Sequence, residues 1–385
     1  MSALRIGQFT DSFPPVINGV STFVSEHHAE LLSRSQAAHV FTFGYARHID
    51  RDANIWRSKG WPLGTSQFRM GWRLSAQARR VADTLDVLHA HEAIDIGHVA
   101  AFLVRLKRRP LIFTNHTRHD LYVQNYPRVL QPMLQRFVSQ NIANFIRSST
   151  LTTAPSHDSV RWLQSLAPDA ADRIRVVRNG IRLDAFDRPP DRALRATLGI
   201  PEERTLFIYV GRVTPEKNLM AFAEAIILAV NQGADAHWVV IGDGQSSAAL
   251  EAKVAPIRSR VSLLGARPHD QIQHYLAMAD VFATTSFSEV NPVSVIEALA
   301  CGKPYLGLHA AWWDEFADES NHEPAGILTK NDPYELAAAI QHLCADRCRL
   351  ERMGARAKCL SRRFDIRVVT SQWLEVYREI IEMFH

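Results

Sequence analysis

The feature that most constrains this chain is a regular alternation of short apolar strands with amphipathic helices, which runs as far as Gly180 and then begins again. Helical patterns between successive strands favour parallel pairing, because a parallel neighbour is reached only through a long crossover. We therefore expect a doubly wound α/β sheet with helices on both faces. The strand-like segments of the first run are Ile6–Phe9, His39–Phe43, Val87–His91, Leu111–Thr114, Leu151–Ala154 and Ile174–Val177.

The longest helical pattern of the first run extends from Val129 to Ile146. Its apolar residues recur every three or four positions, so they would share one side of the helix and pack on the sheet. They are Leu130, Leu134, Phe137, Val138, Ile142 and Phe145.

A domain boundary is predicted between Asn179-Gly180 and Pro189-Pro190, where turn residues interrupt the alternation. The buried-type strand Leu206–Val210 then starts a second run of similar size. A chain of 385 residues is also too long for one ordinary core. We expect an N-terminal domain of residues 1–183, joined by a C-terminal helix of residues 366–385, and a second domain of residues 184–365.

Composition excludes several classes of protein. The 46% hydrophobic and 22% charged residues are typical of a globular chain, and no apolar run reaches the length of a membrane span. Net charge is uneven: residues 1–180 hold 22 Lys and Arg against 13 Asp and Glu, a difference of +9, whereas the remainder is acidic. The sequence has no nucleic-acid-binding signature. Without a signal peptide, and with four cysteines that suit a reducing compartment, we expect a cytoplasmic protein.

The segment Ser286–Pro304 combines a polar turn with a short helix after the apolar strand Val281–Thr284. Proline at 292 suits a first helical turn, and Gly302 suits a left-handed cap at the other end. Glu289 would then lie in the loop and Glu297 about one turn inside the helix. Two carboxylates beside a helix N-terminus suit a ligand that has both hydroxyls and phosphates. Two solvated glutamates on an amphipathic helix are the alternative.

Two cations follow the strand Leu206–Val210, in the loop Gly211–Asn218. Arg212 and Lys217, together with helix-terminal amides, could bind a diphosphate and stabilise charge on a departing one. A solvated strand-to-helix connection is the alternative. Gly242-Asp243-Gly244 resembles a dinucleotide fingerprint, but Ser247 replaces its third glycine, which disfavours a dehydrogenase.

Histidines at strand ends are the candidates for a metal or a substrate contact. His89-x-His91 with Glu92, and His116 with His119, lie at strand ends, but His-x-His on a strand lacks a convergent third ligand, so a hydrogen bond from His116 to substrate is preferred over a metal site. Asp50-Arg51-Asp52 has no apolar strand before it and is not favoured as a metal site. The spacing of the cysteines matches no common zinc pattern. We expect no metal and no cofactor.

These motifs, in this order, resemble the family 4 retaining glycosyltransferases over nearly the whole chain. The matching elements are Asn18-Gly19, His116, Gly211-Arg212 with Lys217, Gly242-Asp243-Gly244, and Glu289-x7-Glu297-Ala-x-Ala-x-Gly-x-Pro. The segment His116–Pro127 after His89–Glu92 looks most like the diacylglycerol glucosyltransferase branch, with the phosphatidylinositol mannosyltransferases more distant. The resemblance implies the GT-B fold, in which two Rossmann-like domains face a central cleft.

The resemblance also implies roles for individual residues. Arg212 and Lys217 would bind the donor diphosphate, Glu297 the ribose and Glu289 the sugar hydroxyls, so that His116, Arg212, Lys217 and Glu289 form the catalytic set. The donor would be a UDP-sugar, or alternatively a GDP-sugar. The donor-binding residues would be Gly19, Gly211, Arg212, Lys217, Gly242, Arg267, Glu289, Asn291, Pro292, Val293 and Glu297. The acceptor-side residues would be His91, His116, Arg118, Tyr122 and Tyr126.

One departure from the family pattern concerns the donor sugar. Asn291-Pro292 stands where the family usually has Phe-Gly. Proline has no N–H, so a backbone contact would be lost or replaced by the Asn291 side chain. No carboxylate is evidently placed as a covalent nucleophile, which favours same-face attack with retention of anomeric configuration.

The acceptor is the part of the reaction that the motifs define least. Branch resemblance implies a glycerolipid at the cytoplasmic membrane face, and the cluster Arg105, Lys107, Arg108 and Arg109 could attract anionic lipid. Leu121–Val123 and Tyr126 could add apolar contacts there. The alternatives are a transferase acting on a soluble sugar or polysaccharide precursor, and a non-catalytic protein that binds nucleotide sugars.

Overall fold

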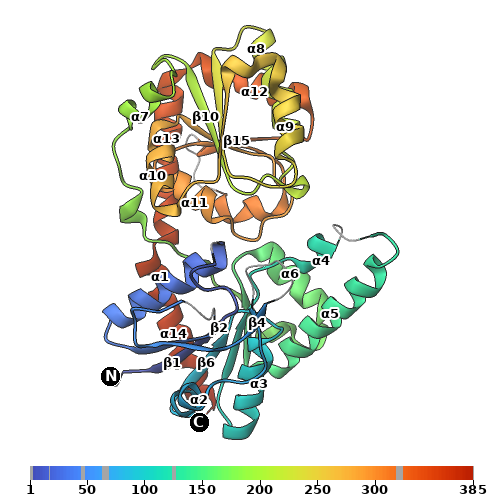
Figure 1. Cartoon of the computed structure of the whole chain (residues 1–385), viewed down its shortest axis with the longest axis vertical. Helices are drawn as coiled ribbons and strands as arrows, with labels where there is room; N and C mark the ends of the chain where they lie inside the picture. Colours follow the sequence, from blue (N-terminus) through green and yellow to red (C-terminus); the bar gives the residue numbers. More distant parts are fainter. Residues whose placement is uncertain are drawn as a thin grey trace. The chain divides into compact units, whose positions relative to one another are not determined.

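The computed structural model describes residues 3–16, 18–44, 48–62, 69–123, 127–317 and 324–384. The chain divides into two compact units. Unit 1 comprises Met1–Ile181 and Asp365–His385, and unit 2 comprises Arg182–Phe364. In each unit a central sheet has helices on both faces, as Figure 1 shows.

Unit 1 contains a seven-stranded parallel sheet in the order β3-β2-β1-β6-β7-β8-β9. The strands are β1 (Arg5–Phe9), β2 (Ala37–Gly44), β3 (Ile55–Lys59), β6 (Val87–Ala90), β7 (Leu111–Thr114), β8 (Leu151–Ala154) and β9 (Ile174–Val176), besides a small antiparallel pair of β4 (Trp61–Pro62) and β5 (Arg69–Met70). The helices are α1 (Gly19–Ser33), α2 (Ala76–Ala82), α3 (Ile96–Lys107), α4 (His119–Tyr122), α5 (Gln131–Ser148), α6 (His157–Leu166) and α14 (Ile366–Phe384).

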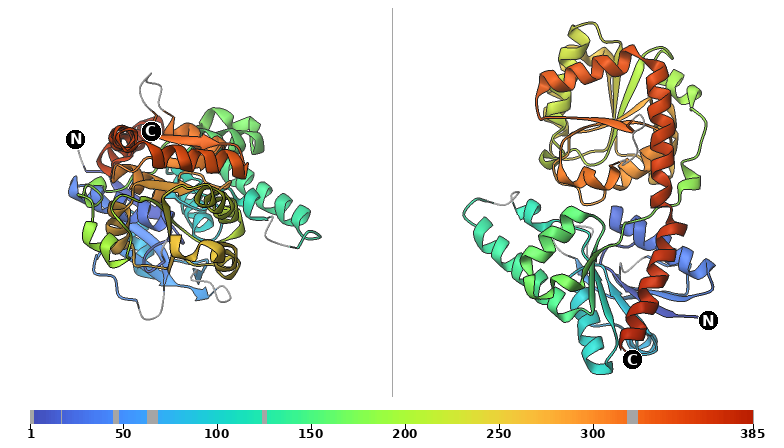
Figure 2. Two further views of the ribbon diagram at one scale, coloured as in Figure 1. Left: turned by 90° about the horizontal axis from the view of Figure 1, so that it is seen from above. Right: turned by 180° about the vertical axis from the view of Figure 1, so that it is seen from behind.

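Two apolar clusters fill the two faces of this sheet. One cluster includes side chains of α2, α3, α5 and α6, and the other includes those of α1 and α14. The C-terminal helix α14, red in the right-hand view of Figure 2, therefore belongs to the core of unit 1 although it is the last element of the chain. Its Trp373 and Tyr377 are fully buried.

A polar network also ties α14 to the sheet. The Tyr377 hydroxyl lies 2.8 Å from Nδ1 of His89 on β6 and 3.2 Å from Nε2 of His27 on α1. His27 in turn lies 3.0 Å from Thr370 Oγ1. Burial lowers the pKa of His27 to about 3, so this histidine is neutral in the folded protein.

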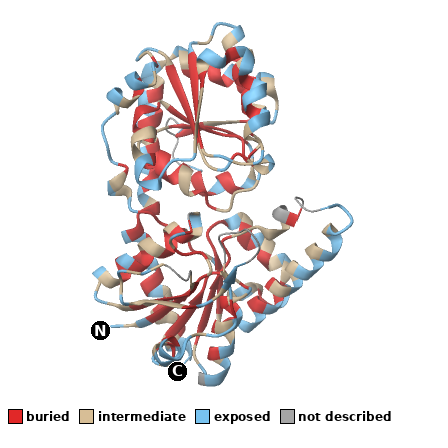
Figure 3. Ribbon diagram, viewed as in Figure 1, coloured by how far each residue is buried: buried red, intermediate tan, exposed pale blue. Residues whose placement is uncertain are grey.

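Unit 2 contains a six-stranded parallel sheet in the order β12-β11-β10-β13-β14-β15. The strands are β10 (Thr205–Val210), β11 (Ala236–Ile241), β12 (Val261–Gly265), β13 (Val281–Thr284), β14 (Tyr305–Leu308) and β15 (Gly326–Thr329). The helices are α7 (Arg192–Thr197), α8 (Leu219–Asn231), α9 (Ser247–Val254), α10 (His269–Met278), α11 (Val293–Ala300), α12 (Pro333–Ala345) and α13 (Arg347–Ser361). The central strands β1, β6, β7 and β8 of unit 1 and β10, β11, β13 and β14 of unit 2 are buried over nearly their whole length (Figure 3).

These two parallel sheets confirm the predicted class of two doubly wound α/β units. The strand order of unit 2 reverses between β10 and β13, and that of unit 1 reverses between β1 and β6. Loops that leave the carboxyl ends of two such strands diverge, and open α/β sheets bind ligands in the crevice between the loops. These two points are therefore where functional residues are expected.

The long amphipathic helix differs from its prediction in one respect. Ile142 and Phe145 are buried as expected, but Leu130 and Phe137 are exposed at 42% and 61%. The reason is length, since a helix of 18 residues far outruns the four-residue strands β7 and β8 beside it. Only the second half of α5 therefore reaches the core.

A search of the described helices for one long and apolar enough to cross a membrane finds none.

Candidate active site

The switch point of unit 2 brings together two loops that carry the predicted donor-site residues. One loop follows β10 and holds Arg212 and Lys217, and the other follows β13 and holds Glu289 and Asn291. Because β10 and β13 pair directly, these loops meet although they are more than sixty residues apart in the sequence.

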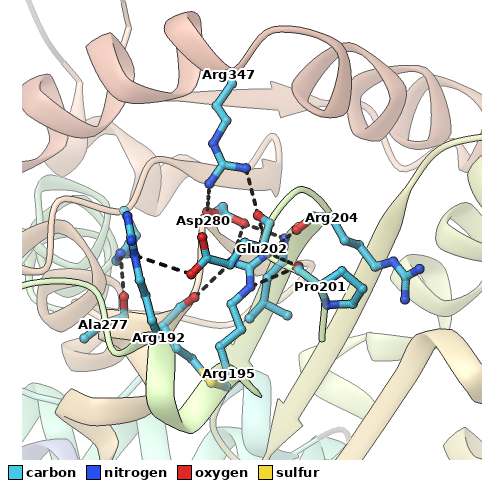
Figure 4. A network of polar contacts seen from close by, with 11 residues as sticks. Arg192, Arg195, Pro201, Glu202, Arg204, Ala277, Asp280 and Arg347 are labelled. Carbon is cyan, nitrogen blue, oxygen red and sulfur yellow. Dashed lines mark hydrogen bonds and ion pairs between the residues drawn. The ribbon is translucent and has the colours of Figure 1, made fainter. Parts of the chain in front are cut away.

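The opposite, amino ends of β10 and β13 are joined by a polar network that is centred on the buried Arg195 and also includes the exposed Arg192, Glu202 and Arg347 (Figure 4). The Arg195 guanidinium is 3.0 Å from Asp280 Oδ2 and also donates to the carbonyls of Pro201 and Glu202. Asp280 Oδ2 accepts from the amide of Leu206 at 2.8 Å, which joins the residue before β13 to β10. This network sets the relative position of the two strands, and so of the loops at their other ends.

Lys217 and Glu289 form an ion pair that bridges the two loops. Lys217 Nζ lies 2.6 Å from Glu289 Oε1, and the side chains are only 11% and 17% exposed. An ammonium has three donors, and within the described residues this carboxylate is the side-chain partner that Lys217 has. The pair leaves donors of the ammonium, and one oxygen of the carboxylate, for a ligand.

Arg212 lies in the first loop with an exposed side chain. Its Nη2 is 3.1 Å from Glu216 Oε1, which also accepts from Thr214 Oγ1 at 2.8 Å. The guanidinium side chain is 56% exposed, so most of it faces solvent. The buried Tyr209 hydroxyl donates to the Arg212 carbonyl at 2.9 Å and holds the backbone of the loop.

Backbone contacts also connect the two loops. Thr285 Oγ1 donates to the Asn218 carbonyl at 2.8 Å, and the Phe287 amide donates to the Glu216 carbonyl at 3.4 Å. Asn218 has a positive φ of 51°, which turns the chain from the loop into α8. The loops thus form one connected structure around the Lys217–Glu289 pair.

Buried polar atoms without a partner gather in this connected structure. Within the described residues they are Glu216 Oε2, Asn218 Nδ2, Ser286 Oγ, Ser288 Oγ, and both amide atoms of Asn291. An unsatisfied buried polar group costs about 1–3 kcal/mol, so such atoms are rare unless water or a ligand satisfies them. Their concentration makes the two loops a candidate site for a polar ligand.

Glu297 has a different partner from Glu289. It lies on α11, is 3% exposed, and its Oε1 is 2.7 Å from Nε2 of His269 at the start of α10. The sequence analysis did not single out His269. Its only signal in the sequence is its place at the start of the helix that follows β12, a third strand with its end on the same edge of the sheet.

Two predicted glycines are explained by close backbone approach. Gly242 has a φ of +136°, and a Cβ at this residue would lie 1.7 Å from the Gly211 carbonyl oxygen. Gly211 has a φ of +155°, and a Cβ there would lie 2.7 Å from the Tyr209 hydroxyl. The close approach of the chain after β11 to the chain after β10 accounts for Gly242, and the contact with the Tyr209 side chain of β10 accounts for Gly211, in both cases without a ligand.

The helix after the second loop begins and ends as predicted. α11 spans Val293–Ala300, with Pro292 as its N-cap and Gly302 at φ +66° after its end. Val293 opens the helix, so its amide is among those of the first turn that have no partner within the helix. Asn291 is 7% exposed, and Arg267 is exposed in the loop between β12 and α10.

The switch point of unit 1 holds the predicted acceptor-side histidines. His91 Nδ1 and His116 Nε2 are 3.0 Å apart, and both residues are buried. Burial lowers the pKa of His116 to about 3 and that of His91 well below its usual value, so both rings are neutral. His116 can therefore hydrogen-bond a hydroxyl but cannot act as a cation at neutral pH.

Two half-buried carboxyls, Glu92 and Asp11, follow the strands β6 and β1; Glu92 was expected only as part of a possible metal set with His89 and His91, and Asp11 was not predicted as a site residue. Glu92 accepts from Thr10 Oγ1 and from the Asp11 amide, both at 3.2 Å, across the switch point between β1 and β6. Burial raises the pKa of Glu92 and of Asp11. A carboxyl that keeps its proton can both donate to and accept from a hydroxyl. Their position after two adjacent strands is the signal that could have identified them.

The other acceptor-side residues differ in their surroundings. Arg118 donates to Asp120 at 2.8 Å and to Asp158 at 2.6 Å, and it lies over the Trp162 ring, so its guanidinium is already engaged. Gly19 is the exposed first residue of α1. Tyr126 lies outside the described residues, and of Tyr122 only its backbone place at the end of α4 is described.

The candidate metal ligands of the sequence have other partners. His89 Nε2 is 2.6 Å from Thr114 Oγ1 and its Nδ1 faces Tyr377, which leaves no ring nitrogen for a metal. Asp50 binds Arg57 at 2.8 Å, and Asp52 lies 2.8 Å from His28 Nε2. Across the part of the chain that the structure describes, no group of three or more His, Cys, Asp or Glu side chains is arranged to hold a metal ion.

Comparison with known proteins identifies the family. Residues 17–185 match the model described as Glycosyltransferase Family 4, and residues 190–359 match Glycosyl transferases group 1. The chain is 31% identical to a D-inositol 3-phosphate glycosyltransferase of Kineococcus radiotolerans, over 80% of this chain and 75% of that protein. It is 26% identical to an alpha-monoglucosyldiacylglycerol synthase of Streptococcus pneumoniae, over 79% of this chain and 70% of that protein.

Solved structures show the same fold. The structure of Anabaena Alr3699/HepE in complex with UDP and glucose superposes with a TM-score of 0.74 at 21% identity, covering 98% of this chain and all of the other. The two doubly wound units, the matches to both family models and the 31% identical relative lead to one conclusion. The chain belongs to the family 4 glycosyltransferases and is a glycosyltransferase of the GT-B fold.

Proposed function

We propose that the protein transfers a hexose from a nucleoside diphosphate sugar, a UDP-sugar in the first instance, to a hydroxyl of a glycerolipid, with retention at the anomeric carbon. The part of the proposal that concerns the donor is supported by the Lys217–Glu289 pair at the switch point of unit 2, with polar atoms around it that have no partner in the described structure. The HepE structures are complexes of that protein with UDP and glucose and with UDP-glucose. The lipid half is supported by relatives named as glucosyldiacylglycerol synthases.

In this proposal the donor is held by the two loops of unit 2. Lys217 and the exposed Arg212 bind the diphosphate, since both are cations of the loop after β10, and Lys217 pairs with Glu289 in the loop that leads into α11. Glu289 accepts from the sugar hydroxyls with the oxygen that Lys217 leaves open. Glu297 binds the ribose hydroxyls, with His269 fixing its orientation. Gly19, Gly211, Gly242, Arg267 and Val293 remain proposed contacts of the donor.

Asn291 replaces the backbone contact that Pro292 lacks. Both of its amide atoms are buried and without a partner in the described structure. A side-chain amide offers two donors and an acceptor, so it can serve a phosphate oxygen or a sugar hydroxyl. The unusual Asn291-Pro292 pair is thus compatible with a donor site.

The chemical step follows from the charges at the site. The acceptor oxygen attacks the anomeric carbon on the face that the diphosphate leaves, the bond from that carbon to the phosphate oxygen breaks, and the acceptor proton passes to the departing phosphate. Negative charge develops on the diphosphate, which Arg212 and Lys217 stabilise. His116 and His91, both neutral, orient the sugar and the acceptor hydroxyl; Arg118, Tyr122 and Tyr126 remain proposed acceptor-side residues. The proposed step needs no metal.

A donor and acceptor screen tests this proposal. Protection from thermal unfolding and slow hydrolysis are measured with UDP-glucose, UDP-galactose and GDP-mannose. Transfer is then measured to diacylglycerol in detergent micelles, and NMR of the product gives its anomeric configuration. We expect one UDP-sugar to protect the protein and an α-linked glycolipid to form. Transfer to soluble sugars but not to the lipid would contradict the acceptor class, and protection without hydrolysis or transfer would contradict catalysis.

A further inference from the structure

The first turns of α5 expose an apolar surface that the fold of unit 1 does not cover. Val129, Leu130, Met133 and Phe137 are 89%, 42%, 63% and 61% exposed. Every buried residue of α5 lies at or after Ile142. Figure 1 shows these turns standing clear of the body of unit 1, and Figure 3 shows no buried segment in them.

The exposed residues form a continuous strip rather than scattered positions. Met133 and Phe137 lie four residues apart on the helix, and Val129 and Leu130 lie in the turn that leads into it. Residues at such spacing share one side of a helix. A contiguous apolar strip on the surface of a protein marks a site that binds another apolar body.

The charged residues around the strip indicate which kind of apolar partner it binds. The sequence has no Asp or Glu between Asp120 and Asp158, whereas Arg128 and Arg136 flank the strip. Neither arginine makes an ion pair within the part of the chain that the structure describes. Apolar side chains bordered by cations, on a stretch of the chain that contains no Asp or Glu, complement the headgroups and the acyl boundary of an anionic bilayer.

The position of the strip suits an acceptor in a bilayer. α4 and α5 follow the carboxyl end of β7, the end that leads into His116. The first turns of α5 therefore begin at the edge of the sheet where the proposed acceptor residues lie. We propose that residues 128–137 are the surface by which unit 1 docks on an anionic lipid bilayer, an inference that rests on the proposed lipid acceptor.

The basic cluster expected from the sequence lies elsewhere. Arg105, Arg108 and Arg109 are at the end of α3, which precedes β7 and so lies at the amino edge of the sheet. Arg109 is also engaged with the Leu85 carbonyl, and Val123, expected as an apolar contact, is buried. A bilayer that contacted this cluster would lie at the edge opposite His116.

This geometry supplies a matched control. Phe102 and Leu106 on α3 are 57% and 53% exposed and have the same spacing of four residues as Met133 and Phe137 on α5. Both pairs have arginine neighbours, Arg105 and Arg108 on α3 and Arg136 on α5. The two pairs differ in the edge of the sheet that they border.

Vesicle sedimentation compares M133S/F137S with F102S/L106S on vesicles of phosphatidylcholine with and without phosphatidylglycerol. The full chain should bind the anionic vesicles at low salt. We expect M133S/F137S to reduce partitioning by at least about tenfold, since two large side chains leave the bilayer, and R136Q by about fivefold. F102S/L106S should bind within about twofold of the unaltered protein, and hydrolysis of UDP-glucose should be unchanged in all three.

A second measurement does not depend on the loss of binding. F137C and F102C, each labelled with a polarity-sensitive fluorophore, are titrated with the same vesicles. Only the label at residue 137 should shift to the blue. The four cysteines, of which Cys348 and Cys359 are exposed and Cys301 and Cys344 partly buried, are first replaced by serine or alanine so that the label is unique.

Three results would overturn the inference. Loss of binding in F102S/L106S alone would assign docking to α3, and equal binding by both double variants would place it elsewhere. If the unaltered protein ignores anionic vesicles but sediments as a dimer that M133S/F137S converts to a monomer, the strip contacts a second copy. In each case transfer to diacylglycerol in micelles still reports separately on the proposed function.

Discussion

Replacing Lys217 should affect stability and catalysis in separable ways, because its ammonium both neutralises Glu289 and, as we propose, binds the diphosphate. Lys217→Met removes a cation 2.6 Å from a carboxylate that is 17% exposed. Breaking a fully buried pair by removing one partner costs about 3–5 kcal/mol. Since Glu289 keeps some contact with water, we expect a loss of about 2–3 kcal/mol in the free energy of unfolding.

The catalytic effect should be as large but should have a different origin. Losing one preorganised contact to a developing charge costs about 3 kcal/mol, which is roughly a hundredfold in rate. Lys217→Met should therefore lower kcat/KM for transfer by about two orders of magnitude.

The double variant K217M/E289Q separates the two effects. Replacing the carboxylate by a neutral amide removes the unpaired charge, so urea unfolding should recover most of the lost stability. Transfer should stay at least as low as in K217M, because the cation is still absent. If activity returned together with stability, the effect on catalysis would come only from the unpaired Glu289. Turnover near that of the unaltered protein in K217M would remove Lys217 from the catalytic set.

Four further outcomes are expected. Arg212→Ala should lower the rate of transfer by about a hundredfold, which initial rates measure. It should change the free energy of unfolding by less than about 0.5 kcal/mol, measured in urea, because the Arg212 side chain is 56% exposed. In calorimetry, Glu297→Ala should weaken binding of UDP alone, whereas Glu289→Ala should weaken only the sugar-bearing donor; equal losses would refute the division. Activity should persist in excess EDTA, and complete loss restored by magnesium or manganese would show that a metal takes part. Burial lowers the pKa of His27 and His116 to about 3, so below about pH 6.5 the folded state binds fewer protons than the unfolded state. The free energy of unfolding should therefore fall by about 2 kcal/mol per histidine between pH 7 and pH 5. A His27→Asn variant whose stability has the same pH slope would contradict this.

Much of the local structure is determined by the sequence alone. A strand is predicted by the apolar run Val281–Thr284, a helix start by Pro292 and a helix end by Gly302. The strand β13 and the helix α11 have these bounds within a residue. Such features depend on interactions between near neighbours in the chain, which the order of residues specifies directly. The alternation of these elements also determined the parallel, doubly wound class of both units.

Partners across the sheet depend on the tertiary structure. The sequence predicted Glu289 and Lys217 as site residues, but their ion pair exists because β10 and β13 are neighbours, and a repeating strand–helix pattern does not encode the order of strands. The contact between His269 and Glu297 has the same origin. Burial likewise made His116 neutral, which its place after a strand could not show.

The helix α5 shows the same division within one element. Its periodicity predicted that Leu130, Phe137, Ile142 and Phe145 share a side of a helix. In the structure these residues do lie in a helix or, for Leu130, at its N-cap. Periodicity specifies which side chains lie together, but whether they are covered depends on how far the neighbouring strands extend. Only the tertiary structure decided that Phe137 lies beyond the core and is exposed. The reason is that the length of β7 and β8, not the sequence of α5, sets the edge of the sheet.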